Sequence, residues 1–105
     1  ATSHLGVVQS KDSFYGQHSP ETMPIYSELE NKWQAWKKAG VLASEMECST
    51  VYVIGNIRGI KTGSVLLAIW NREREKAGLS NPTTEDTDLA IKIAVKAIEK
   101  LIKEP

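Results

Sequence analysis

The sequence of 105 residues predicts an α/β fold in which the strands run largely parallel and helices pack on both faces of the sheet. The first observation behind this is that segments typical of strands alternate with segments typical of helices, the order that builds parallel sheets. The second is that Gly63–Trp70 is apolar on both faces, as a central strand covered by helices on both sides would be. Three predicted strands make a thin sheet, so we expect more strands to lie beside it.

The first elements follow from local residue chemistry. Leu5–Val8 is apolar and predicts a short strand. Glycine and prolines in the next stretch, Ser10–Pro24, predict turns and loop. Ser27–Lys38 has apolar residues at helical spacing with charges between them, and Gly40 stands where it would end that helix.

The later elements repeat the same alternation. Val41–Ala43 predicts a strand that runs into the acidic residues after it. Cys48–Arg58 predicts a mostly apolar helix, and the central strand follows it. Asn71–Asn81 is polar and predicts a loop. Leu89–Ile102 repeats apolar residues at intervals of three and four, after Thr and acidic residues typical of a helix start.

Composition limits the classes of protein to consider. One domain over residues 1–105 is expected from the length. Thirteen basic and thirteen acidic residues give a formal net charge of zero, which favours neither nucleic acid nor an anionic membrane as a partner. A single cysteine, Cys48, excludes an internal disulfide, and the longest apolar run, Val65–Trp70, is too short to span a bilayer as a helix. We therefore expect a cytoplasmic protein.

Polar and aromatic residues follow each predicted strand, where open α/β sheets bind ligands. These segments are Phe14–Gln17, Glu45–Glu47 and Asn71–Arg72. Taken alone, two carboxylates on one face of an extended segment would suit glycoside hydrolysis. An acidic residue in the first turn of a helix also simply complements the helix dipole, and the residues alone favour that structural role.

Three blocks of sequence, in the same order and at similar spacing, carry a resemblance to a known family. Glu45-Met46-Glu47, followed by a small residue and an apolar helix, resembles the signature of the nucleoside phosphorylase and nucleosidase superfamily. Gly6–His18 is similar to the base-binding segment of bacterial uridine phosphorylases, and Leu42–Glu47 and Ile69–Arg72 recur at the family's spacing. The resemblance covers nearly all of this chain but less than half of a family chain. It therefore implies the C-terminal part of a uridine phosphorylase and a fragment of the nucleoside phosphorylase fold.

The resemblance implies phosphorolysis of uridine to uracil and ribose 1-phosphate, a pentosyltransferase reaction of pyrimidine salvage. The sugar passes through a state with oxocarbenium character, so negative charge near the ribose favours the reaction. In the family the second Glu of the motif accepts ribose hydroxyls, and Glu47 takes that place here. Gln17 offers a donor and an acceptor together, which matches a carbonyl beside a ring N–H. Arg72 would supply positive charge as the base leaves.

This chain would then carry the ribose and base subsites. Glu47 and Arg72 are the expected catalytic residues, and the expected substrate contacts are Phe14, Gln17, Glu45, Met46 and Glu47. Each has a structural alternative: Met46 as core filler, Phe14 as a loop anchor, and Arg72 as part of a solvated charged loop. The two histidines have no partner at metal-ligand spacing, so no metal is expected. No cofactor is expected either, because inorganic phosphate is the family's co-substrate.

Two departures from the family's pattern affect the expected activity. The family has an Arg shortly after its base-binding Gln, whereas the first Arg in this chain is Arg58. The family's Gly-rich phosphate site is also missing from these 105 residues, so the isolated chain is expected to be inactive. The alternatives are a purine nucleoside phosphorylase, a nucleosidase, or a non-catalytic remnant that packs as a subunit. Asn71 stands where purine-cleaving relatives have an acidic Asp, which favours a pyrimidine base. A homo-oligomer is expected, as in the family.

Overall fold

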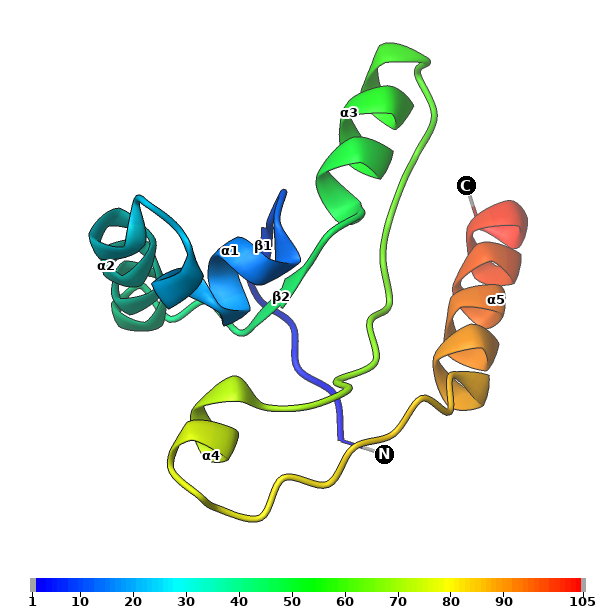
Figure 1. The fold of residues 1–105 in the computed structure, drawn as a ribbon. Coiled ribbons are helices and arrows are strands. Elements are labelled where there is room, and N and C mark those ends of the chain that lie inside the picture. The colour runs from blue at the N-terminus through cyan, green and yellow to red at the C-terminus, as the bar shows by residue number, and fades with distance from the viewer. Residues whose placement is uncertain (1, 105) are drawn as a thin grey trace. The chain divides into compact units, whose positions relative to one another are not determined.

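The computed structural model describes residues 2–104, which form two compact units divided between Lys61 and Thr62. The first unit contains β1 (Val8–Ser10), α1 (Phe14–His18), the 3-10 helix η1 (Pro20–Thr22), α2 (Tyr26–Lys38), β2 (Ala43–Glu45) and α3 (Cys48–Ile57). The second contains α4 (Arg72–Lys76) and α5 (Asp88–Lys103). Figure 1 shows these elements along the chain. The mixture of helices with a parallel pair of strands confirms the predicted α/β class.

The sheet in the described residues has two strands, β1 and β2, which pair in parallel. The backbone N–H of Leu42 donates to the carbonyl of Val7 at 2.9 Å and extends the pairing before β2. The predicted strand Leu5–Val8 was therefore placed too early, because β1 begins at its last residue. Its position is set by the partner strand, and composition alone does not report that register.

Helices fill part of the segment that was predicted to be loop. Ser13 caps α1 by accepting the N–H of Gly16 at 3.0 Å, and Pro20 begins η1. The prediction of a loop over Ser10–Pro24 was wrong in this part, because serine at an N-cap and proline in a first turn both favour short helices. A Cβ on Gly16 would lie 2.9 Å from the Ser13 hydroxyl oxygen, so the turn requires glycine there.

The two longer helices of the first unit agree closely with prediction. After α2, Gly40 has a φ of +76°, and the N–H of Val41 donates to the carbonyl of Trp36 at 3.1 Å. This arrangement is a Schellman motif, which glycine permits because it lacks a Cβ. α3 begins at Cys48, directly after the acidic segment that follows β2.

The second unit differs from prediction in two segments. Residues 63–70 form neither strand nor helix, so the predicted central strand is absent from the described structure. A strand needs hydrogen-bonding neighbours, and apolar composition alone cannot supply them. A five-residue helix, α4, occupies part of the predicted loop over residues 71–81.

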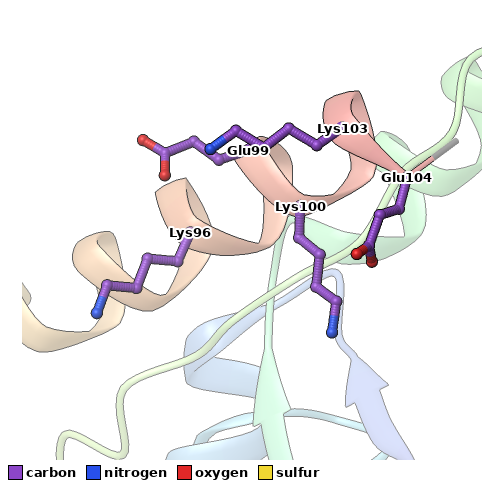
Figure 2. A pocket seen from close by; sticks show the side chains of 5 residues that line it. All are labelled: Lys96, Glu99, Lys100, Lys103 and Glu104. Atoms are coloured by element: carbon purple, nitrogen blue, oxygen red, sulfur yellow. The ribbon is translucent and has the colours of Figure 1, made fainter.

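α5 begins at Asp88 and so confirms the predicted C-terminal helix. Its last turns carry Lys96, Glu99, Lys100, Lys103 and Glu104, which border a surface hollow of about 410 Å³ (Figure 2). These five side chains are exposed and come from one helix and the residue after it. The hollow therefore has the character of a solvated helix face and brings no groups from different elements together.

Apolar side chains remain widely exposed in both units. Ile57 at the end of α3 is 73% exposed, and Ile102 in α5 is 74% exposed. Cys48 is the buried hydrophobic residue of the described chain, and Arg72 is its buried charged residue. Exposed apolar side chains in such number commonly mark places where other protein surface packs. None of the described helices is both long enough and apolar enough to cross a membrane.

Candidate functional site

The carboxyl ends of β1 and β2 lie at one edge of the sheet. Their register pairs Val8 with Ala43 and Ser10 with Glu45. One residue further on, the N–H of Lys11 donates to the carbonyl of Glu45 at 2.8 Å. Parallel strands end at the same edge, so the segment after β1 meets the acidic segment after β2. The structure thus brings together two of the three segments that the sequence singled out.

Glu45 joins the sheet edge to the start of α3. One carboxylate oxygen accepts the backbone N–H groups of Glu47 at 2.6 Å and Cys48 at 2.7 Å, and the other accepts the hydroxyl of Ser10. Ser10 Oγ in turn accepts the N–H of Ser49 at 3.0 Å. These bonds satisfy N–H groups that a helix start leaves without partners inside the helix.

The same contacts control the charge of Glu45. Partial burial alone would raise the pKa of this carboxyl group. The hydrogen bonds from Ser10 and from the backbone of Cys48 and Glu47 outweigh burial and lower the pKa to about 2. Glu45 is therefore ionised at neutral pH, and the structural role that the sequence favoured for an acid at a helix start is present. Substrate contact by Glu45 stays a prediction.

Met46 and Glu47 follow on the solvent side of the same edge. Glu47 is the N-cap residue of α3, and its carboxylate accepts the N–H of Met46 at 3.1 Å. Both side chains are exposed, Met46 to 41%. Met46 is thus not core filler among the described residues, and the Glu47 carboxylate is accessible to a ligand. Their contacts with a ribose remain predictions.

Gln17 reaches the same edge from α1. Its Nε2 donates to the hydroxyl oxygen of Ser44 at 3.1 Å, and Lys11 Nζ donates to that oxygen at 3.1 Å as well. Gln17, Ser44 and Lys11 are all half-buried. An amide group has two N–H donors and an acceptor oxygen, so the bond to Ser44 orients Gln17 and leaves further hydrogen-bonding capacity.

Phe14 lies one helical turn before His18 in α1. The two ring centroids are 4.5 Å apart, and the Phe14 and Tyr15 rings meet edge to face at 5.2 Å. His18 also faces Trp33 of α2, with centroids 6.4 Å apart. Phe14 nevertheless stays 44% exposed. Part of its ring therefore packs on its neighbours in α1, and part of it faces solvent.

Arg72 and Asn71 belong to the second unit. Asn71 caps α4 by accepting the N–H of Arg74 at 3.0 Å, and its backbone exchanges two hydrogen bonds with the Asn81 side chain, at 2.9 and 3.0 Å. Arg72 is 5% exposed, so it is not part of a solvated charged loop. Its expected role near the departing base remains a prediction.

Three residues of this edge were not among the predicted site residues. They are Ser10, Lys11 and Ser44. Their signal in the sequence was that each is a polar residue within or directly after one of the two strands: Ser10 pairs with Glu45, Ser44 pairs with Gln9, and Lys11 follows β1. Recognising them would have required the register of β1 against β2, which the sequence pattern did not provide.

Within residues 2–104, no three His, Cys, Asp or Glu side chains gather as metal ligands. Cys48 is buried at the first turn of α3.

Comparison with known proteins adds independent information. The family model described as the phosphorylase superfamily matches residues 1–104. The uridine phosphorylase of Treponema pallidum (strain Nichols) is 51% identical over 100 residues, covering 95% of this chain and 39% of that protein. The uridine phosphorylases of Klebsiella aerogenes and Escherichia coli (strain K12) are each 30% identical over 105 residues, covering 97% of this chain and 42% of those proteins. The chain thus spans about two fifths of the length of these relatives.

Proposed function

This chain belongs to the phosphorylase superfamily, and we propose that it forms the ribose and base subsites of a uridine phosphorylase. The reaction cleaves uridine with inorganic phosphate and gives uracil and ribose 1-phosphate. Support comes from the similarity to uridine phosphorylases and from one structural observation. That observation is the meeting of Gln17 and the Glu47 segment at one sheet edge, each suited to a different half of a nucleoside.

Glu47 would act on the sugar. As the bond between sugar and base breaks, positive charge develops on the ribose ring, and a carboxylate that accepts ribose hydroxyls stabilises that charge. Glu45 supports this role indirectly, because its carboxylate accepts the backbone N–H of Glu47 and fixes the chain there. Met46 would lie against the sugar.

Gln17 would select the base. A uracil ring presents a carbonyl oxygen beside a ring N–H, and a carboxamide supplies the complementary donor and acceptor. The hydroxyl of Ser44 holds Gln17 in place, so little side-chain freedom is lost when the base binds. Phe14 would pack on the nucleoside, and Arg72 would supply positive charge near the base. Phosphate binding would fall to residues outside these 105, in a protein as long as the relatives. The enzyme would be cytoplasmic and would form a homo-oligomer.

The test is release of uracil from uridine by the protein at its natural length, with and without phosphate. We expect release that depends on phosphate, and slower cleavage of inosine than of uridine, because Gln17 and Asn71 suit a pyrimidine. Equal release without phosphate would indicate a nucleosidase. Faster cleavage of inosine would indicate a purine enzyme, and nucleoside binding without any cleavage would indicate a non-catalytic remnant.

A further inference from the structure

Lys11 lies near both groups to which the proposed function assigns base and sugar binding. Its Nζ shares the Ser44 hydroxyl with the Gln17 amide, each donating at 3.1 Å. Its backbone N–H is fixed by the carbonyl of Glu45, so the side chain starts from an ordered point at the sheet edge. An ammonium group has three N–H donors, and the bond to Ser44 uses one of them.

A pocket of about 290 Å³ opens beside this pair of side chains. Gln17 and Lys11 both line it, and Trp33 and Trp36 of α2 contribute aromatic wall. The volume is near the lower end of the range for small-molecule sites, roughly 300–1,000 Å³. An amide, a cation and aromatic surface around one hollow provide the chemistry that binds a planar ring bearing carbonyl groups.

Burial and nearby charges act in opposite directions on Lys11. Burial lowers the pKa of Lys11, and the nearby carboxylates of Glu45 and Glu47 offset only part of that decrease. Lys32 also lines the pocket, but its side chain is 61% exposed and pairs with Glu28 at 3.7 Å on α2. Lys11 is thus the half-buried lysine beside Gln17, and Lys38 of α2, which is exposed and does not line the pocket, offers a control.

We propose that Lys11 binds a carbonyl oxygen of the base and stabilises the negative charge that the base gains as it leaves. This inference rests on the proposed function. During phosphorolysis a phosphate oxygen bonds to the anomeric carbon, and the electrons of the broken carbon–nitrogen bond remain on the base. A proton from water then neutralises the base. Lys11 supplies charge and a hydrogen bond throughout and transfers no proton.

The experiment compares Lys11→Met, Lys11→Gln, Lys11→Arg and Lys38→Met in the natural-length protein. The substrates are uridine and 5-fluorouridine, whose base is more acidic and leaves more readily. For Lys11→Met we expect kcat/KM for uridine to fall about 100-fold, as for loss of one donor to a developing negative charge. The loss should be several-fold smaller for 5-fluorouridine, because its base needs less stabilisation. Lys11→Arg should recover part of the activity, and Lys38→Met should stay near wild type.

Several outcomes overturn the inference. Equal losses on both substrates would show that Lys11 acts only on the fold of the edge. A raised KM for phosphate with an unchanged response to the base would show that the cation serves phosphate. Lys11→Gln replaces Lys11→Met if the latter does not fold, as judged by its thermal unfolding. Active wild type with unaffected Lys11 variants refutes this inference alone, whereas inactive wild type refutes the proposed function together with it.

Discussion

Replacing Glu45 with Gln tests whether this carboxylate holds the start of α3 to the sheet edge. The wild-type oxygens accept two backbone N–H groups, of Glu47 and Cys48, and the hydroxyl of Ser10. Glutamine keeps the shape and one acceptor oxygen. It replaces the other oxygen with an NH₂ group, which would face donors, and it removes the negative charge. The substitution therefore removes hydrogen bonds and charge without creating a cavity.

The expected loss of stability follows from those contacts. Loss of a helix N-cap costs about 0.5–2 kcal/mol, and loss of a negative charge at a helix start costs about 0.3–1 kcal/mol. Water screens the charge part, because Glu45 is only half-buried. We expect the free energy of unfolding to fall by about 1–2 kcal/mol, measured by urea unfolding of the natural-length protein at pH 7. Glu28→Gln, which removes an exposed acid paired with Lys32, should cost less than about 0.5 kcal/mol.

The contribution of Glu45 to the free energy of unfolding depends on pH. The pKa of Glu45 falls from an ordinary value of 4.5 to about 2 in the folded chain. The folded state thus holds the proton less tightly than the unfolded state. The contribution is fully present above pH 4.5 and disappears as the pH falls toward 2. A Glu45→Gln variant as stable as wild type at pH 7, or a stability difference unchanged between pH 6 and pH 2.5, would refute the reasoning.

Two further predictions concern activity. Glu47→Gln should lower kcat for uridine by about 10²–10³-fold while thermal unfolding stays near wild type, because a charged acceptor of ribose hydroxyls is lost. Turnover near wild type would show that Glu47 serves only as the residue that begins α3. The 105-residue chain made alone should release no uracil at any phosphate concentration, as a uracil assay would measure. It should also self-associate on size-exclusion chromatography, because apolar residues such as Ile57 and Ile102 are exposed. Turnover by a monomer would contradict both parts.

The sequence predicted best those elements whose signals are local. α2 and α3 lie within a residue or two of their expected bounds, because helical spacing and a terminating glycine act within a few residues of each other. α1 was missed although its signal is also local. Ser13 and Gly16 cooperate in one capped turn, and glycine and proline nearby concealed it.

Strand predictions failed where the determining contact lies elsewhere in the chain. The predicted bounds of β1 lay a few residues too early in the chain, because the pairing with β2 sets where β1 lies. Residues 63–70 have the composition of a central strand but no strand partner in the described sheet. The same limit applied to the site. The motif residues Gln17 and Glu47 could be found in the sequence, whereas Lys11 and Ser44 gain meaning only from pairing across the sheet edge.

Glu45 cannot be the proton donor of a glycosidase-type pair of carboxyl groups. Such a pair needs one carboxyl group that is protonated at working pH and can donate to the leaving oxygen. Glu45 has a pKa of about 2 and accepts hydrogen bonds through both oxygens, so at neutral pH it has no proton to give. Its contacts instead fix the backbone from which Glu47 projects. One carboxylate positions the chain and the other stays accessible, an arrangement that suits charge stabilisation during attack by an external nucleophile. That asymmetry gives Glu45 a positioning role and leaves Glu47 as the carboxylate that a ligand can reach.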